Sequence, residues 1–141
     1  MHRAVQALLH PCLLLAPLLL AACSSSPEGP SEPELPALVD FRAGACRTAA
    51  PDLLTLGRTL PRLGDEPTVE ADVQDVLREV QDGLVAVVPA AEPQYAGPLQ
   101  ELVETLGGVR IRAVGNTYDP LLGDNLATAY QRAVEVCTGA E

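Results

Sequence analysis

The clearest pattern in the chain is a helical repeat of apolar residues between residues 68 and 88. Apolar side chains recur there at spacings of one, three or four, which places them on one face of a helix with about 3.6 residues per turn. These residues are Val69, Val73, Val76, Leu77, Val80, Leu84, Val87 and Val88. Thr68 is the predicted N-cap, and Pro89 is expected to end the helix.

Three further segments show a helical period. The first covers about residues 47–60, and it requires that Pro51 lie within the first turn, because an interior proline breaks a helical hydrogen bond. Residues 61–67 then form a loop. Another helix begins between Pro93 and Pro98, and a last one begins at Pro120 with Asp119 as its cap.

Gly107 and Gly108 leave two interpretations of the segment that follows them. In one, the helix ends there and residues 109–114 form a short alternating strand. In the other, the helix continues to Gly115 and Asn116. We favour the continuous helix, because the chain contains no second alternating run that could pair with such a strand.

Four helices with short loops predict an all-α fold, a small antiparallel up-down four-helix bundle over residues 45–141. In this topology the start of the first helix and the end of the fourth lie at the same end of the bundle. Cys46 and Cys137 occupy those two positions. We therefore expect a structural disulfide between them; a redox-active pair, the alternative, normally has close spacing and a lowered pKa.

The first residues show a different pattern. Arg3 precedes an apolar run over residues 4–20, and small residues follow it, which is the layout of an export signal. The alternative is a transmembrane helix, which needs about 20 uninterrupted apolar residues. Pro11 and Pro17 interrupt this run, so an export signal is the better interpretation.

The run closes with Leu20-Ala21-Ala22-Cys23, which resembles the lipobox of bacterial lipoproteins. The resemblance implies that residues 1–22 are a lipoprotein signal peptide and that Cys23 is the lipid attachment site. It also implies a lipid-anchored location at the extracytoplasmic face of the cell membrane. Ordinary signal cleavage, which would leave a free cysteine, is the alternative.

Residues 23–44 are rich in proline, serine and glutamate, a composition that cannot bury enough apolar surface to order itself. They predict a disordered tether, in which Leu38, Val39 and Phe41 are candidates for docking on the folded part. The remainder loosely resembles small helical actinobacterial lipoproteins of unassigned function. That likeness rests on Ala45-Cys46-Arg47 and on Ala129-Tyr130…Cys137.

Composition disfavours several classes of function. Nine Lys and Arg residues against 19 Asp and Glu give a net charge of −10, which disfavours nucleic-acid binding. Both histidines, His2 and His10, precede Cys23, so the mature part lacks an imidazole for a Ser–His–Asp or Cys–His centre. We expect no catalytic residue, no metal site and no cofactor.

Two polar clusters have a functional and a structural interpretation, and we favour the structural one for both. One is an acidic strip on the outer side of the second helix, either a weak cation or docking site or a solvated face with pairs such as Asp75–Arg78. The other precedes the fourth helix and is either a polar pocket or capping and turn residues. The strip comprises Asp72, Asp75, Glu79 and Asp82, and the second cluster Asn116, Tyr118, Asp119, Asp124 and Asn125.

Four charged residues lie between positions 101 and 112, in the third helix and the segment after Gly107 and Gly108. Arg110 and Arg112, which flank Ile111, are candidates to pair with Glu101 or Glu104.

Together these features predict a membrane-anchored extracytoplasmic lipoprotein, a non-enzymatic interaction or accessory module of the cell envelope. Its expected partners are the membrane, through the lipid, and an envelope protein, while the oligomeric state stays open. The alternative function is an extracytoplasmic binding protein for a small apolar or cationic ligand held between the helices.

Overall fold

The computed structural model describes residues 34–139 of the 141-residue chain. The four α-helices are α1 (Ala45–Thr59), α2 (Ala71–Val87), α3 (Pro93–Val114) and α4 (Pro120–Thr138). Short 3-10 helices cover Leu38–Asp40, Leu60–Arg62 and Val88–Ala90. The described residues contain no strand, so the predicted all-helical fold with four helices is confirmed. The predicted signal peptide and Cys23 lie outside the described residues.

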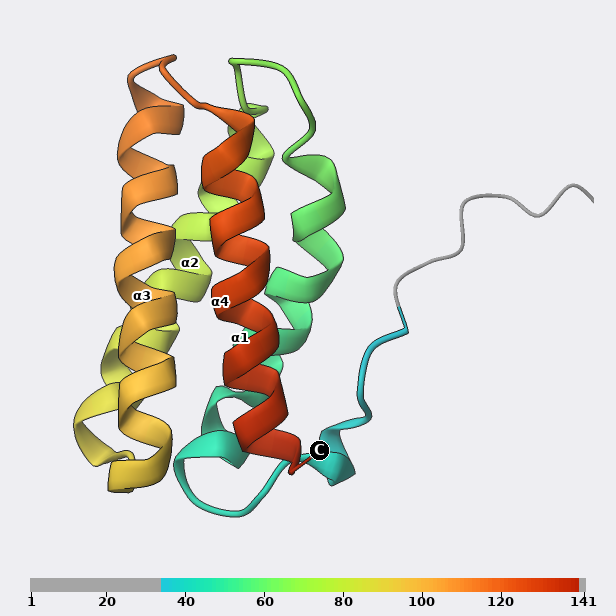
Figure 1. Ribbon diagram of the computed structural model, residues 1–141, viewed down its shortest axis with the longest axis vertical. Coiled ribbons are helices and arrows are strands. Elements are labelled where there is room, and N and C mark those ends of the chain that lie inside the picture. The colour runs from blue at the N-terminus through green and yellow to red at the C-terminus, as the bar shows by residue number, and fades with distance from the viewer. Residues whose placement is uncertain (1–33, 140–141) are drawn as a thin grey trace, which may run out of the picture. The chain divides into compact units, whose positions relative to one another are not determined.

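Each helix packs against the next, and α4 packs back against α1. Figure 1 shows consecutive helices running in alternate directions, with the start of α1 and the end of α4 at the same end. The disulfide between Cys46 and Cys137 joins these two positions, with their Cα atoms 5.1 Å apart. The predicted disulfide is therefore present. The contact between α1 and α4 is the least extensive of the four helix pairs, which leaves room there for a pocket.

The core consists mainly of leucine, valine and alanine side chains from all four helices. On α2 the predicted inner face is the buried one: Val73, Leu77, Val80, Leu84 and Val87 are buried, while Val76 and Val88 are partly buried. Burial of such aliphatic side chains stabilises the fold by about 1.5–3 kcal/mol each.

Helix α1 begins at Ala45, so Pro51 is its seventh residue and does not lie within the first turn as predicted. Two tertiary contacts explain why the helix extends so far back. Ala45 and Cys46 are buried, and the Arg47 side chain donates from Nε to the carbonyl of Phe41 at 3.0 Å. These contacts offset the hydrogen bond that Pro51 cannot donate.

Helix α2 begins later than predicted, at Ala71, and Glu70 rather than Thr68 is the N-cap residue. Arg62 explains the shift, because its guanidinium bonds Glu70 at 2.8 Å and Asp72 at 2.7 Å and so fixes this entry to the helix. The Gln74 side chain also donates to the carbonyl of Val69 at 2.8 Å.

Helix α3 continues through Gly107 and Gly108 to Val114, as favoured from the sequence. Gly115 is its C-cap, and Asn116 adopts a left-handed conformation with φ of 52°. The predicted cap of α4 is also present, since the Asp119 Oδ1 atom accepts a hydrogen bond from the Leu121 amide at 3.0 Å.

The folded domain begins before Ala45. Phe41 is 1% exposed and packs in the core, and the Arg42 amide donates to the Cys137 carbonyl at 2.8 Å. The predicted docking of Phe41 is therefore correct, whereas Leu38 and Val39 remain exposed. Within the predicted tether, residues 34–44 contact the helices through Leu35 and Phe41, and Arg47 donates to the Phe41 carbonyl. Residues 23–33 lie outside the described part.

Candidate functional site

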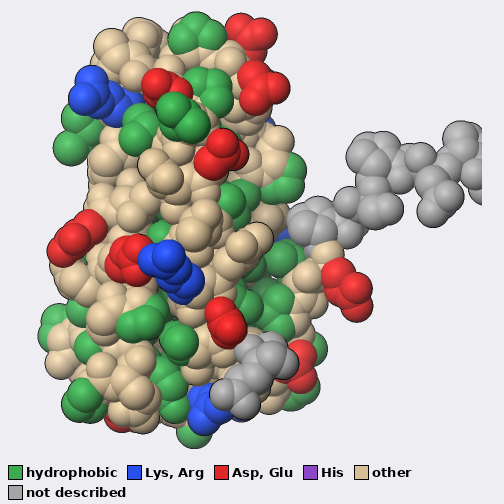
Figure 2. Space-filling view, viewed as in Figure 1, with side chains coloured by type: hydrophobic (Ala, Val, Ile, Leu, Met, Phe, Trp, Pro, Cys, Tyr) green, Lys and Arg blue, Asp and Glu red, His purple; other side chains and the backbone are tan. Residues whose placement is uncertain are grey.

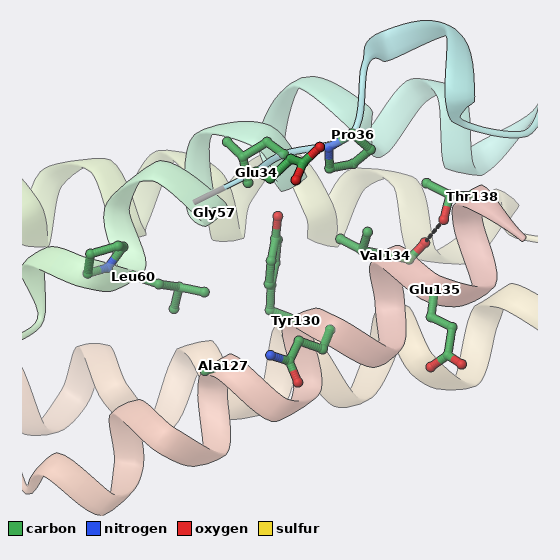
Figure 3. A pocket seen from close by; sticks show the side chains of 12 residues that line it. Glu34, Pro36, Gly57, Leu60, Ala127, Tyr130, Val134, Glu135 and Thr138 are labelled. Atoms are coloured by element: carbon green, nitrogen blue, oxygen red, sulfur yellow. Dashed lines mark hydrogen bonds between the residues drawn. The ribbon is translucent and has the colours of Figure 1, made fainter. Parts of the chain in front are cut away.

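The strongest candidate site is a pocket between α1 and α4, with a volume of about 410 Å³. Its walls are mainly apolar, and Figure 3 shows them converging from α1, α4 and the segment before Leu38–Asp40. We call it the α1–α4 pocket. Its apolar walls comprise Leu35, Pro36, Leu60, Pro61, Ala127 and Val134.

Tyr130 carries the polar group of this pocket. Its side chain rises from α4, and its hydroxyl points between Glu34 and Gly57 (Figure 3). Tyr130 is only 8% exposed, and its buried hydroxyl has no hydrogen-bond partner among the described residues. Burial raises the pKa of the Tyr130 hydroxyl, and the positive charge of Arg58 acts in the opposite direction. The group is therefore a neutral hydrogen-bond donor at physiological pH.

Gly57 makes the space that the hydroxyl occupies. A Cβ atom at this position would overlap the Tyr130 hydroxyl and would lie 2.6 Å from the Leu35 Cδ2 atom. Glycine within a helix costs about 1 kcal/mol relative to alanine. The close approach of Tyr130 supplies a packing reason for glycine here.

The mouth of the pocket is acidic. Glu34 and Glu135 line it and are both exposed, together with the neutral Gln131. Figure 2 shows carboxylates spread over the visible face of the molecule, with few basic side chains among them. The field at the pocket mouth therefore disfavours entry of an anion.

A smaller pocket of about 320 Å³ involves part of the predicted polar cluster before α4. Tyr118 and Asp124 line it, and the Tyr118 ring is buried with its hydroxyl close to Gly123. Burial, then the charges of Asp124, Asp65 and Asp119, raises the pKa of Tyr118.

The other members of that cluster do not line this pocket. Asp119 caps α4, and Asn116 forms the turn after α3. Asn125 is exposed on α4. The capping and turn interpretation therefore accounts for Asn116 and Asp119, whereas Tyr118 and Asp124 are brought together.

The acidic strip of α2 is exposed and partly ion-paired. Asp75 pairs with Arg78 at 2.8 Å, as predicted, and the Arg62 hydrogen bond lowers the pKa of Asp72. Within residues 34–139 no group of histidine, cysteine, aspartate or glutamate side chains is arranged to hold a metal ion.

The predicted pairing of Arg110 and Arg112 with Glu101 or Glu104 is wrong. Arg110 instead donates to the Gln81 side chain on α2, Arg132 on α4 binds Glu101 at 2.8 Å, and Glu104 accepts from Gln100. These glutamates and arginines lie six or more residues apart on one helix, too far for i,i+3 or i,i+4 pairing, and the observed partners of Arg110 and Glu101 come from adjacent helices.

This arrangement leaves an exposed apolar surface where α3 ends. Ile111 and Val114 are 75% and 71% exposed, and with Gln81, Gly107 and Arg110 they line a hollow of about 440 Å³. We call Arg110, Ile111 and Val114 the distal surface, because α3 ends here and α4 begins nearby, at the opposite end of the bundle from the disulfide (Figure 1).

The α1–α4 pocket is not among the features predicted from the sequence. The available signal was a tyrosine on an inner face otherwise built of small and aliphatic residues, because a buried tyrosine hydroxyl normally requires a partner. A glycine on the inner face of the first helix was the second signal.

Comparison of the chain with protein-family models, with curated proteins and with solved structures finds no match in any of the three. Among the described helices, none has the length and apolar content required to span a membrane.

Proposed function

We propose that this protein is a lipid-anchored extracytoplasmic module of the cell envelope that acts by contacting an envelope protein and not by catalysis. Two features support the location. The segment ending in Cys23 resembles a lipobox, and the disulfide between Cys46 and Cys137 is of a kind that persists in oxidising, extracytoplasmic compartments.

The observation that carries the interaction role is the distal surface. Two large aliphatic side chains, Ile111 and Val114, are side by side and mostly exposed beside the cationic Arg110. Adjacent exposed apolar groups bordered by polar groups are typical of protein contact sites. The disulfide joins the start of α1 to the end of α4, and the distal surface lies at the other end of the bundle, away from this covalent link.

Residue types support binding over catalysis. The chain has no lysine, and its two histidines precede Cys23. The polar groups of the α1–α4 pocket are a neutral tyrosine hydroxyl, the Thr138 hydroxyl, which donates to the Val134 carbonyl, and exposed rim side chains.

The anchor is tested by metabolic labelling with a palmitate analogue in a bacterial host that acylates lipoproteins. We expect the label to be incorporated in the wild type and in Cys12→Ala, and to be lost in Cys23→Ala. Equal labelling of Cys23→Ala would contradict attachment at this cysteine.

The interaction is tested by photo-crosslinking in intact cells of the native host. A photoreactive amino acid at Ile111 is expected to give one discrete crosslinked envelope protein, whereas the same group at the exposed Gln94 near the other end of α3 should not. Identical crosslinking patterns from the two positions would contradict a role of the distal surface.

A further inference from the structure

We infer that the α1–α4 pocket binds a small, uncharged, apolar molecule that presents a hydrogen-bond acceptor, such as a carbonyl or ether oxygen, to the Tyr130 hydroxyl. This inference is independent of the proposed anchor and of the distal surface, because it depends on residues 34–138 alone. The site lies along α4 from Ala127 to Thr138.

The apolar walls of the α1–α4 pocket indicate that the ligand is largely apolar. Leu35, Leu60 and Val134 are only partly buried, although each packs against the core. A volume of about 410 Å³ lies within the range of about 300–1,000 Å³ that is usual for small-molecule sites. Filling this space with an apolar molecule would remove the remaining apolar surface of the walls from water.

The unpartnered hydroxyl of Tyr130 indicates that the ligand carries a hydrogen-bond acceptor. A buried hydroxyl without a partner carries the cost of its lost hydration, and buried polar groups in proteins are nearly always paired. Here the hydroxyl is more than nine-tenths buried, lacks a partner among the described residues and faces the pocket. Gly57 has no Cβ atom, which allows the hydroxyl to lie against α1 at the edge of the pocket. A ligand oxygen at this position would accept the hydrogen bond that the protein leaves unmade.

The acidic mouth of the α1–α4 pocket indicates that the ligand carries no negative charge. A ligand that enters passes Glu34 and Glu135, and an anion would be repelled by both carboxylates. Arg58, whose positive charge acts on Tyr130, is exposed to solvent, so water and salt screen its charge.

Benzophenone is a suitable probe, because it is small, uncharged and apolar, has one carbonyl acceptor, and forms a covalent adduct with nearby C–H groups on irradiation. We would irradiate the purified, disulfide-bonded full-length chain with increasing benzophenone and map the adducts by mass spectrometry. The expected result is saturable labelling at the pocket walls, chiefly at Leu35 and Val134.

Tyr130→Phe keeps the ring and removes the donor. It is expected to raise the half-saturating concentration of benzophenone roughly 3- to 10-fold, the effect of losing one hydrogen bond. Tyr118→Phe is the matched control, because it removes the hydroxyl of a buried tyrosine in the other pocket, and it should leave labelling unchanged. Unchanged labelling of Tyr130→Phe, with its disulfide intact, would overturn the inference.

A second experiment tests whether the pocket excludes anions, and it uses a substitution at the exposed Glu135. The anionic analogue 4-benzoylbenzoate should label the wild-type pocket several-fold more weakly than benzophenone, and Glu135→Gln should narrow that difference. Equal labelling by the neutral and anionic probes, or adducts spread over the surface without saturation, would contradict the proposed site.

Discussion

Tyr130 and Asp52 each place a polar group in an unfavourable environment. Tyr130 holds an unpartnered hydroxyl beside Gly57, and Asp52 lies half-buried on α1 against Gly83 of α2. Both positions combine a polar group on one helix with a glycine on the neighbouring helix. The two contacts therefore have consequences for stability that can be measured.

Tyr130→Phe should stabilise the ligand-free domain, in contrast to its expected effect on binding. The substitution removes a buried hydroxyl that makes no hydrogen bond, and leaving such a group unpaired costs about 1–3 kcal/mol. We expect the free energy of unfolding in urea to rise by about 1 kcal/mol. A decrease would show that the hydroxyl has a partner in solution, and Tyr118→Phe serves as the comparison.

Asp52 should make stability depend on pH. Burial raises the pKa of Asp52 in the folded state, so the fold disfavours its charged form. The group therefore costs no stability below its unfolded pKa, and it destabilises the domain as the pH rises through its folded pKa. Asp52→Asn should raise the free energy of unfolding at pH 7 and have little effect at pH 3.

The matching control is Asp82→Asn, which removes an exposed carboxylate from α2. It reports how much of the gain comes from reducing the net negative charge of the domain. Equal gains for both variants at pH 7 would refute a specific role of burial at Asp52.

At the scale of helices, two glycines should respond to alanine in opposite ways. Gly108 in α3 has open space where a Cβ atom would stand, so Gly108→Ala should add about 1 kcal/mol of stability through helix propensity. A Cβ atom at Gly83 would overlap the Asp52 carboxylate, so Gly83→Ala should bring no gain or a loss.

A double-mutant cycle separates these effects. In the Asp52→Ala background the overlap is absent, and Gly83→Ala should recover the gain of about 1 kcal/mol. Urea denaturation of the four chains gives the coupling between the two positions. A Gly83→Ala effect that is identical in both backgrounds would exclude the contact with Asp52.

The local pattern of apolar residues predicts where the helices lie better than it predicts where they begin. Apolar spacing alone located all four helices, and the missing strand partner correctly favoured continuity of α3 through Gly107 and Gly108. The starts of α1 and α2 were wrong because they depend on side-chain contacts that the apolar period does not encode. Phe41 and Arg47 extend α1 backwards, and Arg62 fixes the entry to α2.

The pocket was harder to anticipate for the same reason. Its walls come from α1, α4 and the segment around Leu35, which the composition had assigned to a tether. An inner-face pattern identifies which residues are buried, but it does not show where two helices pack loosely enough to leave space. That property depends on side-chain volumes across the interface, as at Gly57 and Tyr130.

At the scale of the whole molecule, the disulfide closes a loop that contains nearly the entire domain. Its two cysteines are separated by 91 residues, so the constraint on the unfolded chain is worth about 4–5 kcal/mol in the chain-entropy model. The double variant Cys46→Ala/Cys137→Ala should lose about this much free energy of unfolding in urea. Total stability of a small domain is about 5–15 kcal/mol, so the variant should be marginal.

Reduction of the Cys46–Cys137 disulfide in the wild type is the control for the double variant. Dithiothreitol should lower the stability of the wild type toward that of the double variant and should leave the double variant unchanged. A loss below about 1 kcal/mol would show that the helices hold the domain together without the covalent link.

The joining of Cys46 to Cys137 also decides how the molecule carries mechanical load. Tension applied between the chain before Cys46 and the residues after Cys137 passes directly across the sulfur–sulfur bond. The helices between these two positions form a side loop that such a pull does not stretch. An oxidised molecule held by its two ends in an optical trap should therefore extend without releasing the length of its bundle.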